Sequence, residues 1–335
     1  MSDSKPITAE DRIPLAGSGL AIPPLGVGTW AWGDRETWGY QGYDSGLSID
    51  TIRDAYRRSV ELGVTFLDTA EGYGDGESER IIARLRAEDP ALAERTIVAT
   101  KFVPFPWRRP FAKTLLLALR ASLDRLGMPF VHLYQIHGPI SMAPASVLAE
   151  PLAEAHRAGL VKAVGVSNYS EREMRAMHRE LAKRGLPLAS NQVEYSLLRR
   201  MPETVGLLRA CRELGVVLLA YSPIGQGRLT GKYSAANPPP GKRNFSAHAP
   251  AEIERVVAAL RRIGEKHGGR TPGQVALNWL MCKGAVPIPG AKNPRQAEEN
   301  AGSLGFRIDD GDVAELDGVA LYGQRTLAHR IWQHG

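Results

Sequence analysis

The sequence predicts a (β/α)8 barrel of the TIM-barrel class, because short apolar runs alternate with longer amphipathic segments along most of its 335 residues. Eight of these runs have strand length, at 25–30, 64–68, 96–101, 131–136, 161–166, 188–193, 216–221 and 285–289. Strands that alternate with helices form a parallel sheet, which is either open and doubly wound or closed into a barrel. The first strand and its turn read GVGTWAWG, which lacks the Gly-x-Gly-x-x-Gly pattern of an open dinucleotide-binding sheet, so the closed barrel is favoured.

The helices between these strands are marked by their spacing and by their ends. Leucines recur at three or four residues over 111–126, which is helical periodicity. Ser170 and Glu173 stand in capping-box register before a helix over 171–184. Further helices are expected at about 251–267 and 272–283, with a short one in the tail 311–335. A glycine stands between helix and strand five times, where a C-cap residue is expected, at Gly63, Gly127, Gly159, Gly185 and Gly215.

We expect one barrel domain over 1–335, with a core at about 25–300 and a C-terminal tail at 301–335. Two short apolar stretches around Gly17-Ser18-Gly19 predict an N-terminal β-hairpin within 11–24, placed to close the bottom of the barrel. The Pro-rich stretch NPPPGKRN at 237–244 predicts a mobile surface loop.

Composition excludes several classes of protein. Lys and Arg exceed Asp and Glu by 42 to 36 but are scattered along the predicted helices, which does not indicate a nucleic-acid partner. The only two cysteines are Cys211 and Cys282, so neither a disulfide framework nor a Cys-rich metal site is expected, and no metal is predicted. The chain lacks an apolar leader and any run of 18 apolar residues, so we expect a cytoplasmic protein without a membrane partner.

Four chemically active side chains fall at the ends of three consecutive predicted strands. Asp68 and Tyr73 follow the second strand, Lys101 ends the third, and His137 follows the fourth. Taken singly, Asp68 could cap a helix, Lys101 could be solvated, and His137 could pack in the core or in a loop. In a barrel, however, the C-terminal ends of the strands meet where the active site forms. The coincidence of all four side chains there favours an active site.

These four groups suit the protonation of a developing alkoxide. A Tyr hydroxyl titrates near ~10, and a nearby cation such as Lys101 would stabilise its phenolate. Asp68 would hold the ammonium in place and keep it charged. A neutral His137 would donate a hydrogen bond to a carbonyl oxygen and so orient a substrate. An alkoxide forms when hydride reaches a carbonyl carbon, and a nicotinamide cofactor would supply that hydride.

Other strand ends and two later segments could hold such a cofactor. Ser167, Asn168 and Gln192 could bind a carboxamide and Tyr221 could stack on a flat ring, although the first two also suit an ordinary turn. The segment 288–300 carries Lys292 and Arg295 at a helix start, which suits an anion or else a solvated helix end. The Gly-rich stretch SPIGQGRLTGKY at 222–233 fails the P-loop pattern, because Tyr233 follows Lys232. We expect it to wrap a pyrophosphate.

The sequence resembles the aldo-keto reductase superfamily in FLDTAEGYG, ATK, YQIHGP, VGVSN, NQVEYS, AYSPIGQGRLTGK and PIPGAK…EEN. The resemblance implies a (β/α)8 barrel that uses NADPH or NADP⁺, and a catalytic tetrad of Asp68, Tyr73, Lys101 and His137. It further implies cofactor contacts at Gly28, Thr29, Trp30, Asp68, Ser167, Asn168, Gln192, Tyr221, Ser222, Pro223, Ile224, Gly225, Gly227, Arg228, Leu229, Gly290, Ala291, Lys292, Gln296, Glu299 and Asn300.

One position departs from the family pattern. Many members carry an Arg for the 2′-phosphate where this chain has Gln296. Lys292 precedes it by four residues on the same helical face, and the two together favour NADPH over NADH.

Aromatic residues are expected to wall a large substrate pocket. Trp30 and Trp32 follow the first strand, with Trp38, Tyr40 and Tyr43 further along, and FVPFPWRRPF follows the third. With Tyr73 and His137 they suit an aryl, heterocyclic or terpenoid carbonyl or alcohol. The leading hypothesis is a carbonyl reductase, and its oligomeric state is left open. Two alternatives are a regulatory subunit resembling potassium-channel β-subunits, with little turnover, and a Schiff-base lyase that uses Lys101.

Overall fold

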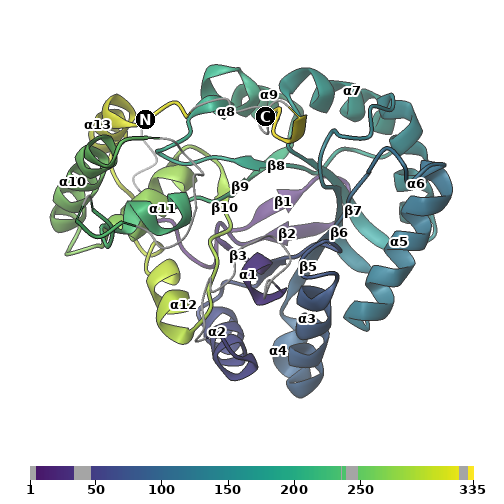
Figure 1. The fold of residues 1–335 in the computed structure, drawn as a ribbon, viewed down its shortest axis with the longest axis horizontal. Coiled ribbons are helices and arrows are strands. Elements are labelled where there is room, and N and C mark those ends of the chain that lie inside the picture. The colour runs from purple at the N-terminus through teal and green to yellow at the C-terminus, as the bar shows by residue number, and fades with distance from the viewer. Residues whose placement is uncertain (1–4, 34–46, 235, 239–247, 324–330) are drawn as a thin grey trace.

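The computed structural model describes residues 5–33, 47–234, 236–238, 248–323 and 331–335. Within these residues, eight parallel strands follow one another around a barrel in chain order, and helices surround them (Figure 1). A parallel bridge between Gly28 and Gly290 joins the first strand to the segment after the last and closes the sheet. The predicted (β/α)8 barrel is therefore confirmed. Trp38, Tyr40, Tyr43 and most of the Pro-rich stretch 237–244 lie outside the described residues.

All eight predicted barrel strands are present, most of them shorter than the apolar runs. They are β3 Gly26–Gly28, β4 Phe66–Asp68, β5 Ile97–Phe102, β6 Val131–Ile136, β7 Val161–Ser167, β8 Ser190–Glu194, β9 Val217–Tyr221 and β10 Val286–Pro287. The helices are α1 Trp30–Gly33, α2 Ile49–Glu61, α3 Glu77–Glu88, α4 Pro90–Glu94, α5 Phe111–Leu126, α6 Ala145–Arg157, α7 Glu171–Ala182, α8 Met201–Thr204, α9 Leu207–Leu214, α10 Pro250–Lys266, α11 Pro272–Cys282, α12 Pro294–Ala301 and α13 Asp310–Val319. A 3₁₀ segment, η1, spans Gly225–Thr230.

The helix ends follow the sequence signals. All five predicted C-cap glycines have positive φ, between 61° at Gly127 and 82° at Gly63. Ser170 Oγ accepts a hydrogen bond from the Glu173 amide, and the Glu173 carboxylate accepts one from the Ser170 amide, which is the predicted capping box. Among the described residues, no helix is long and apolar enough to cross a membrane.

The predicted hairpin consists of β1 Ile13–Leu15 and β2 Leu20–Ile22, and it closes the N-terminal end of the barrel. Leu15 and Ile22 are buried against side chains from the early part of the barrel strands, including Phe66, Leu133 and Val217. The opposite end, at the C-terminal ends of the strands, therefore carries the polar side chains.

A close backbone contact fixes the segment after β4. Gly74 has φ +61°, and a Cβ there would lie 1.9 Å from the carbonyl oxygen of Gly33 at the end of α1. A Cβ on Gly33 would in turn lie 2.5 Å from the carbonyl oxygen of Tyr73. These two glycines let α1 press against the turn that carries Tyr73.

Gly127 offers a matched control for this contact, because it has the same φ of +61° but nothing within 4 Å of its Cβ position. We expect Gly127→Ala to lower the free energy of unfolding by about 1 kcal/mol, from backbone strain alone. Gly74→Ala should cost about 2 kcal/mol more, because the backbone of α1 or of the turn must move. Urea unfolding of both variants measures the difference. Equal losses would show that the contact with Gly33 is not a constraint.

Candidate active site

Lys101 joins the predicted catalytic groups at the C-terminal end of the barrel. Its Nζ donates to Asp68 Oδ2 at 2.6 Å, to the Tyr73 hydroxyl at 3.1 Å and to the Thr69 carbonyl at 2.9 Å. The ring of His137 meets that of Tyr73 edge to face, with centroids 5.7 Å apart. The structure thus brings together all four side chains that the sequence singled out.

The neighbours of Lys101 set its charge state. Lys101 is 0% exposed and Asp68 is 1% exposed. Burial opposes the ammonium, but the charges of Asp68 and Tyr73 and their hydrogen bonds outweigh it and raise the pKa of Lys101 above its ordinary value. The Lys101 side chain is therefore a cation at neutral pH and carries no free amine.

Tyr73 and His137 stay neutral. Burial raises the pKa of Tyr73 above its ordinary value, against the opposing charge of Lys101. Burial, with a smaller contribution from Lys101, holds the pKa of His137 well below its ordinary value. Lys101 was expected to stabilise the phenolate of Tyr73, and its charge does lower that pKa, but in this structure burial outweighs its effect. The phenol is protonated and the imidazole uncharged at neutral pH.

The second oxygen of Asp68 has partners that the sequence argument missed. Asp68 Oδ1 accepts from Gln192 Nε2 at 2.7 Å and from Gln135 Nε2 at 3.3 Å. Gln192 was expected to face the cofactor, and Gln135 was not singled out. Its signal in the sequence was its place two residues before His137, on the same strand as other inward-facing residues.

The predicted carboxamide ligands form one hydrogen-bonded group beside His137. Asn168, with φ +64°, donates from Nδ2 to the His137 carbonyl and to Ser167 Oγ, both at 3.1 Å. Ser167 Oγ donates to the Gln192 carbonyl at 2.9 Å, and the Tyr221 hydroxyl donates to Asn168 Oδ1 at 2.9 Å. The four predicted residues therefore lie together at the ends of β7, β8 and β9.

The predicted pyrophosphate segment follows β9 in an irregular turn. Ser222 has φ +50°, Gln226 has φ +55° and Gly227 has φ +89°. Arg228 and Leu229 are buried, and Pro223, Ile224 and Gly225 complete the turn into η1. The turn buries the cationic side chain of Arg228, which donates to the Gly225 carbonyl at 3.3 Å, and a buried cation suits a bound anion.

The predicted adenosine segment is held mainly by hydrogen bonds between its own side chains and its backbone. Gln296 Oε1 accepts from the Lys292 amide at 2.9 Å, and Asn300 Nδ2 donates to the Gly290 carbonyl at 3.1 Å. Glu299 accepts from Thr271, and Ala291 is buried. Gln296, in the first turn of α12, thus holds the backbone at Lys292. This is next to the position that the family resemblance implies for the 2′-phosphate.

The predicted residues that follow β3 differ in burial and in what they contact. Thr29 is buried, and its hydroxyl donates to the Asp68 carbonyl at 2.9 Å, so it supports the β4 end. Trp32, expected in the substrate pocket, is 1% exposed in the core and donates from its indole to the Ala291 carbonyl at 2.7 Å. In this structure Trp32 ties α1 to the adenosine segment. Trp30 is half-buried at the start of α1.

Side chains from the C-terminal segment also reach the site, which the sequence argument did not anticipate. The Trp332 ring lies against that of His137, with centroids 5.4 Å apart. Gln333 donates to the Tyr221 hydroxyl at 2.5 Å, and the His334 amide donates to the Asn168 carbonyl at 3.0 Å. No periodicity or motif marks this segment, because its contacts join residues more than a hundred positions apart in the chain.

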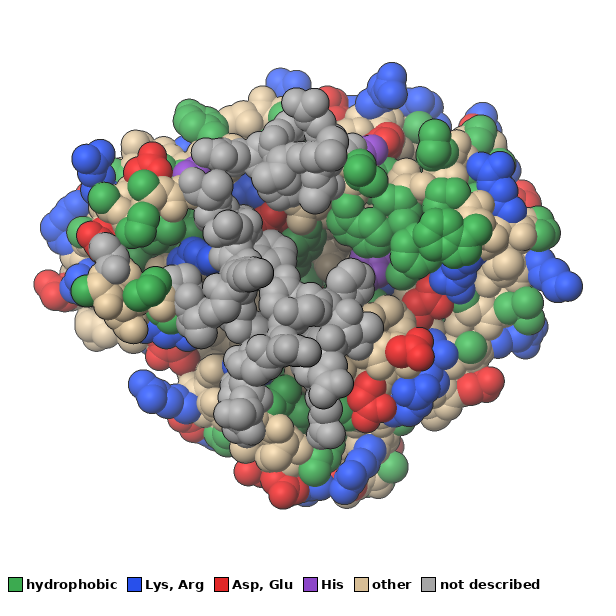
Figure 2. All heavy atoms as spheres, in the orientation of Figure 1, with side chains coloured by type: hydrophobic (Ala, Val, Ile, Leu, Met, Phe, Trp, Pro, Cys, Tyr) green, Lys and Arg blue, Asp and Glu red, His purple; other side chains and the backbone are tan. Residues whose placement is uncertain are grey.

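Glu71, which the sequence analysis did not single out, anchors the loop after β5. It accepts from the Val103 amide at 2.7 Å and from the guanidinium of Arg108. That loop presents the stacked rings of Phe105 and Trp107, with centroids 4.5 Å apart. Trp107 is 75% exposed. In Figure 2, hydrophobic side chains gather on the face of the barrel on the side of α5 and α6.

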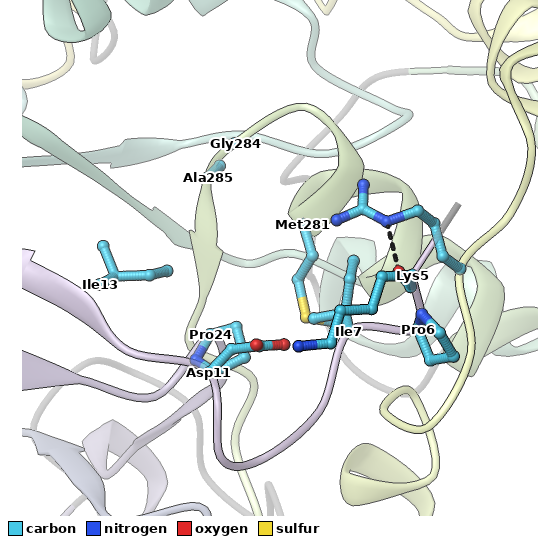
Figure 3. Close-up of a pocket in the computed structure, with 10 residues that line it drawn as sticks. Lys5, Pro6, Ile7, Asp11, Ile13, Pro24, Met281, Gly284 and Ala285 are labelled. Atoms are coloured by element: carbon cyan, nitrogen blue, oxygen red, sulfur yellow. Dashed lines mark hydrogen bonds between the residues drawn. The ribbon is translucent and has the colours of Figure 1, made fainter. Parts of the chain in front are cut away.

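A separate pocket lies at the other end of the barrel, beside the hairpin (Figure 3). It is lined by residues that include Lys5, Asp11, Ile13, Pro24 and Arg307, and encloses about 190 Å³. None of the predicted catalytic or cofactor residues lines it.

The residues at the C-terminal end fit a bound nicotinamide cofactor. His137 Nδ1 is buried without a hydrogen-bond partner among the described residues, and so is Gln226 Oε1. The donor set there combines amides, hydroxyls and the buried Arg228, which are the groups that hold a carboxamide and a pyrophosphate.

Comparison with known proteins shows the family of this chain. Residues 24–321 match the model of the aldo/keto reductase family. The chain is 39% identical to a chloroplastic pyridoxal reductase of Arabidopsis thaliana, over 94% of this chain and 87% of that protein. It is 29% identical to an L-glyceraldehyde 3-phosphate reductase of Escherichia coli, over 94% of this chain and 93% of that one.

Solved structures agree. An aldo-keto reductase from Klebsiella pneumoniae in complex with NADPH superposes with a TM-score of 0.70 at 25% identity, over 92% of this chain and 95% of that one. An aldo-keto reductase complexed with NADPH superposes with a TM-score of 0.73 at 28% identity, over 97% and 92%. The chain belongs to the aldo/keto reductase family.

Proposed function

We propose that this protein reduces an aldehyde or ketone to an alcohol with NADPH, and that Tyr73 gives the proton. The observation that carries the proposal is Lys101 Nζ, which binds Asp68 Oδ2 and the Tyr73 hydroxyl at once. Bound NADPH would supply the hydride. Ser167, Asn168, Gln192 and Tyr221 would hold its nicotinamide end. The segments 222–229 and 290–300 would hold its pyrophosphate and adenosine ends.

Each member of the tetrad then has a defined task. His137 is uncharged and half-buried, and it orients the carbonyl oxygen by a hydrogen bond from its ring. Tyr73 transfers its hydroxyl proton to that oxygen as negative charge develops there. Lys101 stabilises the phenolate that Tyr73 becomes, and Asp68 keeps Lys101 charged and in place.

The charge state of Lys101 argues against the Schiff-base alternative. A lyase of that kind needs a free amine that a substrate carbonyl can reach. Lys101 is 0% exposed, its three protons go to Asp68, Thr69 and Tyr73, and its pKa is raised. A regulatory subunit with little turnover differs from a reductase by its activity, which the first experiment below measures.

The aromatic side chains around His137 favour a planar aromatic aldehyde as substrate. Tyr73 and Trp332 both lie against the imidazole, and the Phe105–Trp107 stack projects from the loop after β5. One relative is a pyridoxal reductase, and pyridoxal is a planar heteroaromatic aldehyde. We therefore propose pyridoxal as the first substrate to test.

The reaction and its substrate can be tested by following the consumption of NADPH. With wild-type protein we expect kcat/KM for pyridoxal or benzaldehyde to exceed that for glyceraldehyde at least ~10-fold, because aromatic rings bury more surface against Trp332 and its neighbours. Tight NADPH binding without turnover of any carbonyl would favour the regulatory subunit. A preference for glyceraldehyde would contradict the aromatic substrate but not the reaction.

Tyr73→Phe tests the proton donor. We expect kcat to fall about 10²- to 10⁴-fold, because the variant lacks the general acid, while the Kd for NADPH stays within about threefold. Tyr134→Phe is a matched control: Tyr134 is 0% exposed, and its hydroxyl has no hydrogen-bond partner among the described residues. It should keep wild-type kcat. A Tyr73→Phe variant with full activity would contradict the mechanism.

The pH dependence of reduction follows from the two shifted groups. Activity requires neutral His137, which holds above its lowered pKa, and protonated Tyr73, which holds below its raised pKa. We expect a flat kcat/KM between about pH 6.5 and 9, because the ordinary values of His and Tyr, ~6.5 and ~10, lie at or beyond these limits. A pH-rate profile checks this. A His137-dependent midpoint near pH 7 would contradict it.

A further inference from the structure

Gln135 is a buried amide in contact with the catalytic cluster to which the mechanism above gives no task. We propose that Gln135 is a positioning residue: it holds Asp68 in the orientation that presents Oδ2 to Lys101. The inference rests on the proposed reduction, because it assigns Gln135 a part in that reaction. Its grounds are the register of the barrel, the chemistry of the amide and the space left by a glycine.

The register of the sheet places Gln135 in a continuous row of neighbours around the barrel. Lys101 on β5 pairs with Gln135 on β6, Gln135 pairs with Gly165 on β7, and Gly165 pairs with Ser190 on β8. Residues that pair in this way face the same side of a parallel sheet. Lys101, Gln135 and Ser190 are each 0% exposed, so the row forms a dry polar layer inside the barrel.

The chemistry of its neighbours fixes which way the Gln135 amide points. An ionised carboxylate only accepts hydrogen bonds, so the amide nitrogen must face Asp68, and Nε2 lies 3.3 Å from Oδ1. The amide oxygen then faces Ser190, whose hydroxyl donates to Oε1 at 3.2 Å. Ser190 therefore secures the orientation in which Gln135 serves as a donor to Asp68.

Gly165 provides the space that this arrangement needs. A Cβ at Gly165 would lie 2.1 Å from Ser190 Oγ and 3.1 Å from Gln135 Cγ. Any other residue at Gly165 would displace the hydroxyl that holds the amide. The three residues Gln135, Gly165 and Ser190 thus act as one support behind Asp68.

A second donor on Asp68 Oδ1 matters because the first has another task. Gln192 donates to Oδ1 at 2.7 Å, yet Gln192 is also one of the residues proposed to hold the nicotinamide carboxamide. If Gln192 turns to the carboxamide, Gln135 still occupies Oδ1. The carboxylate then keeps Oδ2 on Lys101, which binds it at 2.6 Å.

Two substitutions separate positioning from space filling. Gln135→Leu keeps the approximate volume but removes the donor, and we expect kcat to fall about 10-fold, because catalytic groups shifted by a fraction of an ångström lose much of their effect. The Kd for NADPH, measured by fluorescence, should stay within about threefold. Asn278→Leu is the matched control: Asn278 is also 0% exposed, and its side chain bonds to the loop after α12 and to the Cys282 thiol, away from the site. It should lower the melting temperature and leave kcat unchanged.

The Gln135→Glu variant tests positioning through the pH dependence of kcat, which would not change if Gln135 had only a structural role. A protonated Glu can donate to Asp68 and accept from Ser190 as Gln135 does, whereas an ionised one repels Asp68 and competes with it for Lys101. The charged and titratable groups around this position are Asp68, Lys101, Tyr73 and His137. Burial and the neighbouring carboxylate raise the pKa of such a carboxyl. We expect kcat within about threefold of wild type near pH 5.5 and at least ~30-fold lower near pH 8.5.

The outcomes distinguish this inference from the proposed function. If the wild-type protein reduces no carbonyl, the proposed reaction itself is contradicted. If wild type is active, the inference is overturned by wild-type kcat in Gln135→Leu, or by a Gln135→Glu to wild-type ratio that does not change with pH. If Gln135→Leu does not fold, Ser190→Ala replaces it, with an expected loss of about threefold in kcat and unchanged NADPH binding.

Discussion

The buried ion pair between Lys101 and Asp68 is the constraint on which the rest of this site depends. Taking an ammonium and a carboxylate out of water costs several kcal/mol for each ion, which their attraction repays only when the remaining hydrogen bonds are also satisfied. Here they are: Lys101 reaches Thr69 and Tyr73, and Asp68 accepts from Gln135 and Gln192. The barrel interior is therefore polar at this level, although it is apolar at the hairpin end.

The pair also explains why the site needs the whole barrel. Asp68, Lys101, Gln135 and Gln192 come from β4, β5, β6 and β8, and a slip of one residue in any strand would turn its side chain to the outer face. Register is held by the apolar layer beneath, where Phe66, Ala99 and Leu133 occupy the inward positions two residues earlier on the same strands. The position of the catalytic groups is thus set by packing at the other end of the barrel.

Much of this was predictable because it depends on local signals. Alternating runs gave the eight strands, glycines with positive φ gave the helix ends, and the strand-end rule of barrels gave Asp68, Tyr73, Lys101 and His137. Contacts between distant segments were not predictable. Glu71 meets Arg108, and Trp332 meets His137, through loops whose paths leave no periodicity in the sequence. Trp32 was placed in the pocket because it is aromatic and follows β3, but the turn into α1 directs it to the core.

The balance of burial against the field of Lys101 bears on the direction of the reaction. In the proposed mechanism, reduction needs a protonated Tyr73, which the raised pKa supplies throughout the neutral range. Oxidation of an alcohol needs the phenolate as base, and its fraction falls tenfold for each pH unit below that pKa. The charge of Lys101 stabilises the phenolate of Tyr73, but the protonated phenol remains the predominant form at neutral pH. In the proposed mechanism the same four side chains therefore favour reductive activity at neutral pH, and alcohol oxidation gains only as the solution becomes alkaline.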